Sequence, residues 1–396
     1  MHQFDYLINN LRKYKYDFIK NITKNVVIPK QKFLKQAIPA VLLSGSLIIT
    51  KYAKWIRDNC KDMHHSKKRL LNQLNNKTQW QRILQNYRCS FASKIQPDTP
   101  LIIDMTDIAK PRAEKMQYVA TVRDGSKGNL TRGYWCLEVY AHVSKHVTIP
   151  LALHTYSIED PDIYSENKQV LNVIKQVNDD VDGKGIWIGD RGFDRLNLYK
   201  GLFKENIHFI IRQKGNRHVV LNNGVHTEVE LLCERCYQNQ VVRGNNSRIV
   251  YIAVKLPERT EPLYLVAMFS PQYKRPLMLL TTMKVFNLSQ ARDIVAFYVK
   301  RWKCEEAIAF LKGRIGFEQF SVRNYERMKH LVLLAMLAMG FLCFIQLNSR
   351  VLVKGLFRFT SKFRKSISFE YYRLLDGLQH FIHQLLIERQ KPPELL

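Results

Sequence analysis

Two short apolar runs decide the fold, residues 101–104 (LIID) and residues 185–190 (GIWIGD). Each run is long enough for one buried strand, and each ends in a carboxylate, Asp104 or Asp190. Strands without polar alternation are usually buried on both faces of a sheet. Open α/β sheets place functional groups at the carboxyl ends of such strands. We therefore expect Asp104 and Asp190 to converge if the two strands lie side by side.

The segments around these runs predict an α/β protein. Before the second run, alternating residues predict strands at 117–123, 134–144 and 148–156 and a helix at 165–178 capped by Ser165. A helix near 195–204 and a strand at 208–212 follow it. Residues 213–284 then read as strands and turns, with strands at 217–221, 248–256, 263–269 and 277–283. This β-rich stretch interrupts the simpler α/β plan.

A long helix is expected from Ser289, as its N-cap, to Gly313. At 100° per residue, Tyr298, Arg301, Glu305 and Lys312 share a face about 60° wide, and Glu306 points about 100° away from Glu305. The alternative interpretation is a solvated stripe, because Arg301 and Glu305 form an i,i+4 pair.

Three carboxylates that meet at one site need a cation. Without one, mutual repulsion would raise their pKa values until protons bind. Mg²⁺ prefers carboxylate oxygens and binds substrate phosphates. Two such ions about 4 Å apart suit phosphodiester chemistry.

The charge of the chain indicates a polyanionic partner. There are 62 Lys and Arg residues against 34 Asp and Glu, a net charge of +28 with a pI near 9.8. Residues 1–100 hold 19 basic and 5 acidic residues, which gives +14. Their apolar spacing predicts helices at 4–18, 31–48 and 66–87, and a Pro-rich break at 96–100 ends the region. We expect a helical DNA-binding domain with salt-dependent affinity, the alternative being a solvated helical face.

Other features favour a protein of the cytoplasm, associated with the nucleoid. The apolar run 331–345 is shorter than a bilayer span and is expected to be a helix behind the sheet. No signal peptide begins the chain, and the 7 scattered cysteines fit reduced thiols. Cys233-x-x-Cys236 lacks a second pair, and His64-His65 reads as a basic loop, so neither predicts a metal site.

Three blocks of the sequence resemble bacterial insertion-sequence DDE transposases of the cut-and-paste type. These blocks are Asp104 with Thr106, Asp190 in Gly-Asp-Arg-Gly, and the signature Tyr298-x2-Arg301-x3-Glu305-x6-Lys312. The resemblance covers about residues 95–345. It implies a ribonuclease H-like core, a mixed sheet flanked by helices, with a β-rich insertion.

The resemblance also implies the roles of the site residues. Asp104, Asp190 and Glu305 would bind two Mg²⁺ ions, with Mn²⁺ as a substitute, while Tyr298, Arg301 and Lys312 would hold DNA phosphates. We divide the chain into an all-α domain (1–95), a core in two parts (96–212 and 285–347), the insertion (213–284) and a helical tail (348–396). The partners expected are the element ends and target DNA, bound by a homodimer.

Several residues near these blocks remain alternatives. Arg212, Lys214 and Arg217 enter the insertion and either line DNA or form a solvated hairpin. Asp107, Asp182 and Asp194 are alternative or supporting carboxylates, and Asp190 is preferred over Asp194 because it closes its strand.

The insertion departs from its hairpin-forming relatives. Those relatives often carry a Trp there, whereas this chain has none between Trp187 and Trp302. A hairpin route is therefore not implied, although Tyr273 or Phe286 could stack on a base. Two other functions remain open, a non-catalytic DNA-binding protein and a metal-dependent nuclease without end specificity.

Overall fold

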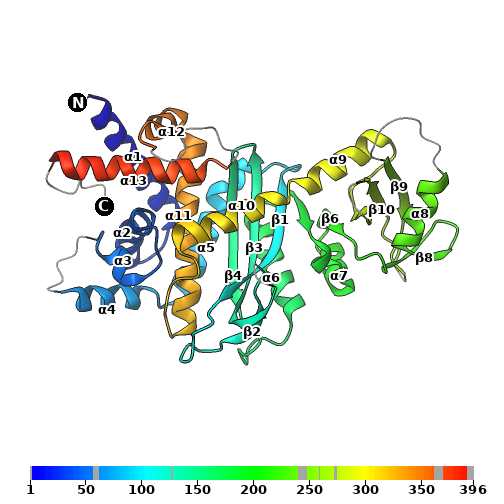
Figure 1. The fold of residues 1–396 in the computed structure, drawn as a ribbon, viewed down its shortest axis with the longest axis horizontal. Helices are drawn as coiled ribbons and strands as arrows, with labels where there is room; N and C mark the ends of the chain where they lie inside the picture. Colours follow the sequence, from blue (N-terminus) through cyan, green and yellow to red (C-terminus); the bar gives the residue numbers. More distant parts are fainter. Residues whose placement is uncertain are drawn as a thin grey trace.

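The computed structural model describes residues 2–56, 62–125, 128–239, 248–257, 259–271, 274–360 and 369–389. Five helices precede the first strand, which confirms the all-α N-terminal region (Figure 1). They are α1 (His2–Ile22), α2 (Ile28–Ser44), α3 (Ile49–Ala53), α4 (Met63–Gln73) and α5 (Lys77–Phe91), followed by the 3₁₀ turn η1 (Ala92–Lys94). The helix expected at 66–87 is two helices, because Asn76 adopts φ 69° and caps α5. The helix expected to reach residue 48 ends at Ser44, because Gly45 takes φ 57°.

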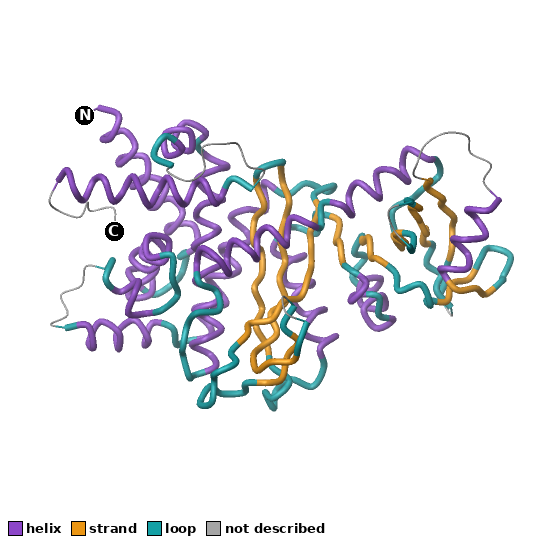
Figure 2. The backbone as a smooth tube through the Cα atoms, in the orientation of Figure 1, coloured by secondary structure: helices purple, strands orange, loops and turns teal. Residues whose placement is uncertain are grey.

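A mixed sheet of nine described strands forms the centre of the molecule (Figure 2). Its order is β2-β3-β1-β5-β6-β11-β10-β9, with β4 paired to β3. The strands β1, β5 and β6 are parallel, and the other pairings are antiparallel. The bounds are β1 (Pro100–Ala109), β2 (Ala120–Arg123), β3 (Leu130–Ser144), β4 (Val147–Tyr156), β5 (Ile186–Gly189), β6 (Phe209–Arg212), β9 (Arg248–Val254), β10 (Leu263–Phe269) and β11 (Leu277–Thr281).

Two helices connect the parallel strands as the sequence predicts. The helix α6 (Glu166–Asp180) leads from β4 to β5, and its N-cap Ser165 accepts a hydrogen bond from the Lys168 amide. The helix α7 (Leu196–Lys204) connects β5 to β6. These crossovers place β1 beside β5, so the two apolar runs that end in aspartates are neighbours in the sheet.

The β-rich insertion extends the core sheet. Its strand β11 pairs antiparallel with β6, and β10 and β9 follow outward, while β7 (His218–Val220) and β8 (His226–Glu228) form a separate hairpin. The expectation of strands and turns alone was wrong, because α8 (Val229–Asn239) lies in this stretch. Val229, Leu232 and Cys233 are buried at helical spacing, and this periodicity outweighs the surrounding strand pattern. The glycine turn expected at 244–246 lies outside the described residues.

The continuous helix expected at 289–313 is three segments. The helix α9 (Leu288–Val299) begins after Asn287, whose side chain accepts from the Gln290 amide, so Asn287 and not Ser289 is the N-cap. A turn at Lys300 and Arg301 separates it from α10 (Trp302–Phe310). A π-helical turn, η3 (Leu311–Ile315), then ends at Gly316 with φ 70°. Such π turns are frequent at functional sites.

The run 331–345 lies in α11 (Tyr325–Asn348), which packs on β4 and on α2. This helix is long and apolar enough to cross a membrane, but 83% of its most apolar window is buried inside the protein. It therefore serves here as a core helix behind the sheet, as expected. The helices α12 (Arg350–Phe357) and α13 (Tyr371–Arg389) pack against α11, so the C-terminal segment joins the same helical layer (Figure 1).

Candidate active site

Asp104 and Asp190 lie next to each other across two parallel strands. The β1–β5 pairing ends at Ile103 and Gly189, and the two aspartates directly follow this pair. Asp190 follows the end of β5 as predicted, but β1 continues to Ala109, so the expectation that Asp104 ends its strand was wrong, because β3 keeps pairing with β1 beyond it. Neighbouring strands are about 4.8 Å apart, so the two aspartates lie side by side where the β1–β5 pairing ends. Burial raises the pKa of Asp104, and the negative charge of Asp190 raises it further. The sheet thus places together the two aspartates that the sequence singled out.

The Gly-Asp-Arg-Gly turn fixes the Asp190 side chain. Asp190 caps the 3₁₀ turn η2 (Arg191–Phe193), and its Oδ1 accepts the Gly192 amide at 2.7 Å. A Cβ at position 192 would lie 2.9 Å from this oxygen, and a Cβ at Gly189 would lie 3.1 Å from Phe193. Both glycines are therefore required for close packing around the carboxylate.

Arg301 joins the third carboxylate to the first. Its guanidinium lies 2.8 Å from Asp104 Oδ2 and 2.8 Å from Glu305 Oε1. The Cys304 thiol also donates to Asp104 Oδ2, at 3.2 Å. Glu306 pairs instead with Lys303 at 2.5 Å, on another side of α10. Of the two adjacent glutamates, only Glu305 is thus linked to Asp104.

Lys312 and Tyr298 contact different parts of the site. Lys312 Nζ lies 3.0 Å from Glu318 and 3.6 Å from the buried Asp107, so the π turn directs it toward the end of β1. Tyr298 is 5% exposed and belongs to a small core cluster formed with β5, β6 and β11. Burial raises its pKa, and the nearby charges of Arg301 and Arg212 partly offset that shift. The signature residues Tyr298, Arg301, Glu305 and Lys312 therefore do not lie on one face of a continuous helix, because the helix breaks at Arg301 and ends in a π turn.

The remaining candidates differ in how their side chains are used. Asp194 is 3% exposed and bonds Arg217, the Lys214 amide and the Tyr199 hydroxyl, so its oxygens are occupied by the loop after β6. Asp182 is exposed and pairs with Lys184 at 3.1 Å. Arg212 ends β6 near Tyr298, whereas Lys214 is exposed in the loop beyond it.

Two aromatic side chains are candidates for stacking on a base, Tyr273 in the insertion and Phe286 just after it. Phe286 is 65% exposed and contacts Tyr264 edge-on at 5.7 Å. Tyr273 lies outside the described residues. Phe286 is therefore the aromatic side chain of this pair that the structure places on the surface.

The sequence reasoning missed Glu138, a fourth carboxyl group at the site. It faces Asp104 in the β1–β3 register and is 2% exposed, and its Oε2 accepts the Tyr140 hydroxyl at 2.8 Å. Burial raises its pKa well above the usual range, and Asp104 adds to this shift. The signal was a lone acid in the apolar strand 134–144, a pattern that marks a buried carboxyl group.

The carboxylates fit a divalent metal site by their chemistry. They offer carboxylate oxygens where the β1–β5 pairing ends, and a cation would offset both the burial that chiefly raises the pKa of Asp104 and the smaller effect of the Asp190 charge. Arg301 supplies positive charge between Asp104 and Glu305. In the part of the chain that the structure describes, the carboxylate oxygens of Asp104, Asp190 and Glu305 are not all within 4.8 Å of one another.

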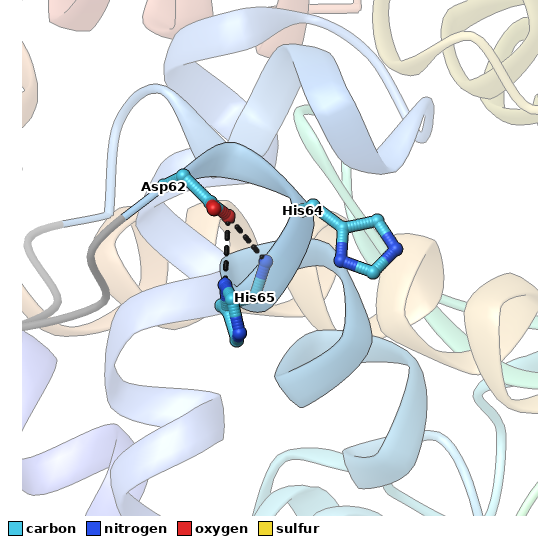
Figure 3. Close-up of side chains that lie close together, drawn as sticks. All are labelled: Asp62, His64 and His65. Carbon is cyan, nitrogen blue, oxygen red and sulfur yellow. Dashed lines mark hydrogen bonds and ion pairs between the residues drawn. The ribbon is translucent and has the colours of Figure 1, made fainter.

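Another group of described side chains does bring its ligand atoms within 4.8 Å of one another. It consists of Asp62, His64 and His65 at the start of α4 (Figure 3). All three are exposed, and Asp62 accepts both the His65 amide and its Nδ1 at 2.9 Å. His64 points away from Asp62 in Figure 3. The arrangement is an N-cap, which explains these contacts without a metal.

Comparisons with known proteins identify the family of the chain. The family described as "Transposase DDE domain" matches residues 95–341, which is more than half of the chain. Among solved structures, the chain is similar to one described as a piggyBac transposase synaptic complex with hairpin DNA. The identity is 13% and the TM-score 0.48, over 98% of this chain and 80% of that chain. No curated protein matches the sequence. The matched region holds all three carboxylates and has the ribonuclease H-like order of strands, so the chain belongs to the family of proteins with a transposase DDE catalytic domain.

Proposed function

We propose that the protein is the transposase of a bacterial insertion sequence that moves by cut and paste. In this proposal it binds the terminal inverted repeats of its element, hydrolyses the DNA strand at each end and joins the new 3′ ends to target DNA. The observation that carries the proposal is the linkage of Asp104, beside Asp190, to Glu305 through Arg301. A structural ion pair alone would not require two aspartates side by side where the β1–β5 pairing ends.

Asp104, Asp190 and Glu305 would hold the divalent ions that DDE transposases use. Mg²⁺ is the ion we propose, as a pair, with Mn²⁺ as its substitute. Bound there, such ions activate an attacking oxygen and stabilise the leaving oxygen of a phosphodiester. Their positive charge would also replace that of Arg301 beside the carboxylates.

The basic residues around the carboxylates would hold the DNA. Arg301, once released from Asp104 and Glu305, is placed to bind a phosphate beside the cleaved bond. Lys312, on the π turn, and Arg212, at the end of β6, would add further phosphate contacts. The resemblance assigns Tyr298 to a DNA phosphate as well, but its side chain is 5% exposed, so we propose that it supports the site from its buried position. Lys214, exposed in the next loop, would contact the backbone further away.

A cleavage assay on a linear duplex that carries the element ends tests the proposal. We expect nicking at the ends that needs Mg²⁺ or Mn²⁺, stops with a chelator and is lost in Asp104→Asn and Asp190→Asn. A product with joined 3′ ends should appear when target DNA is added. End binding should survive both substitutions, because the basic residues remain.

The two alternative functions give different results in the same assay. Tight end binding without nicking under every divalent ion would support a non-catalytic DNA-binding protein. Equal cutting of duplexes that lack the ends would support a nuclease without end specificity. We also propose that a homodimer binds the paired ends, which the mass of the protein–DNA complex would test.

A further inference from the structure

A large open cavity lies beside the catalytic domain, apart from the carboxylates. Its volume is about 1030 Å³. Three segments line it: residues 47–50 with part of α4, residues 109–116 after β1, and residues 318–324 before α11. The cavity therefore opens between the N-terminal helical layer and the end of the strand that carries Asp104.

The lining of this cavity is strongly basic. It contains six Lys and Arg residues but only two carboxylates, Glu114 and Glu318, and Glu318 already pairs with Lys312. Four of the cations are exposed and have no ion pair with any residue that the structure describes: Lys67, Arg112, Lys115 and Arg323. Unpaired like charges on three separate segments repel one another, and a polyanion in the cavity would relieve that repulsion.

The walls of the cavity are fixed to each other without a ligand. The Gln117 amide donates to Arg323 O at 3.0 Å, and Gln117 Oε1 accepts the Tyr325 amide at 3.0 Å. Deeper in, the buried Lys110 Nζ donates to Glu318 O at 2.5 Å and to Phe320 O at 2.6 Å. These bonds join the loop after β1 to the segment before α11. Two of the three cavity segments are thus held together before anything binds, so their backbones need not be ordered on binding.

The cavity is at a defined distance from the catalytic carboxylates. Strand β1 carries Asp104, and five residues further on Ala109 begins the cavity wall, its amide bonded to Glu318 at 3.2 Å. At about 3.3 Å per residue this separation is about 17 Å. Duplex DNA rises about 3.4 Å per base pair, so this length corresponds to about five base pairs.

We propose that this cavity receives a sugar-phosphate backbone of duplex DNA about five base pairs from the reacting phosphate. The inference rests on the proposed function, since it assumes a DNA phosphate at the carboxylates. The helical layer, through Lys67, and the catalytic domain, through Arg112 and Arg323, would then hold the same duplex. Such contacts fix the position of DNA without reading its sequence. The duplex is either the element end or the target.

The test compares two double variants of the full chain. Arg112→Gln with Arg323→Gln removes two cavity cations. Lys145→Gln with Lys200→Gln removes the same charge at the β3–β4 turn and on α7, where both lysines are exposed. Both variants should unfold at nearly the same temperature as the wild type, because the substituted side chains are exposed.

We expect the cavity variant to lose at least tenfold in DNA affinity and about 1.8 in the log-log salt slope, for two phosphate contacts. Ethylation of the phosphate about five base pairs from the cleaved bond should block the wild type but not this variant. If the cavity variant loses affinity only for end duplexes, the cavity binds the element end. If it loses affinity only in target capture, the cavity binds the target DNA. Affinity, slope and interference equal to those of the control variant in both assays would overturn the proposal.

Failure of the proposed function would look different. In that case the wild type itself would not nick the end duplex under any divalent ion. The comparison of affinity and salt slope between the two variants would still report whether the cavity binds DNA.

Discussion

Glu305 and Glu306 are neighbours in sequence but have different partners. Glu305 bonds the arginine that also holds Asp104, whereas Glu306 pairs with Lys303. Glu305→Gln keeps the shape of the side chain and removes one charge from the carboxylate group. It should lower strand cleavage by several orders of magnitude, since metal-based stabilisation is worth several kcal/mol, and leave end binding nearly intact.

Glu306→Gln is the matched control for this prediction. It should cleave within a few-fold of the wild type, because its ion pair with Lys303 is partly exposed and does not involve Asp104 or Arg301. Nicking and end binding would be measured for both variants. If Glu306→Gln were the inactive one, the assignment of Glu305 would be wrong.

Arg301 is predicted to stabilise the metal-free protein. Its guanidinium is 13% exposed and neutralises Asp104 and Glu305. Arg301→Gln should lower the free energy of unfolding in chelator by about 3 kcal/mol, because it leaves the poorly solvated Asp104 carboxylate without its cation, whereas the more exposed Glu305 contributes little. Added Mn²⁺ should raise the melting temperature of this variant more than that of the wild type. An equal rise in both proteins would mean that Arg301 and the metal do not share the same carboxylates.

Glu138 gives a prediction for the pH dependence of stability. Its pKa is raised in the folded protein, so between about pH 4.3 and the folded-state pKa the folded chain holds a proton that the unfolded chain releases. The free energy of unfolding therefore falls as pH rises through this window. Glu138→Gln cannot titrate, so it should lack this decrease in the free energy of unfolding. The decrease amounts to at most about 1.4 kcal/mol for each pH unit.

Melting curves in metal-free buffer from pH 4.5 to 8 would measure this difference. The melting temperature of Glu138→Gln, relative to that of the wild type, should increase as pH rises. Tyr140→Phe is the control, because it removes only the hydroxyl that bonds Glu138 and keeps the carboxyl group. A difference between Glu138→Gln and the wild type that does not change with pH would contradict the prediction.

At the scale of elements, the turn after β5 is predicted to control catalysis through one hydrogen bond. Gly192→Ala would place a Cβ 2.9 Å from Asp190 Oδ1 and force that carboxylate to move. Cleavage should fall at least tenfold, while the melting temperature changes little. Gly125→Ala is the control, since its Cβ would meet the Asp107 carboxylate at an ordinary 3.6 Å. Equal activity of both variants would show that the Asp190 position is not critical.

The sequence predicted the elements with local signals well. The strand 263–269 and the Ser165 cap of α6 were both confirmed, because alternation and capping are local properties. The interruption of the long helix at Arg301 was not predicted. There the pairing of Arg301 with Asp104, 197 residues away, accompanies the break, and helical periodicity contains no information about such a partner. Glu138 was missed for the same reason, because its importance comes from facing Asp104 across two strands.

At the scale of the whole molecule, the N-terminal helices and the sheet share one hydrophobic core. The buried Tyr87 of α5 donates to Pro150 O in β4 at 2.8 Å, and the core cluster runs from Leu7 to Leu385. Removing residues 1–95 would therefore expose α11. The expected contribution of this region to DNA affinity is better tested by charge substitution in the full chain, as for the cavity.

The far end of the sheet is predicted to handle DNA without contributing to the metal site. The acids Glu228, Glu230 and Glu234 lie in the insertion. Glu228 is 3.8 Å from His218, Glu230 is 3.4 Å from Arg275, and Glu234 is exposed on α8. Strand β6 and the insertion strands separate this end of the sheet from β1.

Substituting all three acids by Gln should leave Mg²⁺-dependent nicking within a few-fold of the wild type, because none follows a buried parallel strand as Asp190 does. Nicking rates of this triple variant and of Asp104→Ala would be compared under the same conditions. A loss as large as that of Asp104→Ala would mean that Glu305 is not the third ligand.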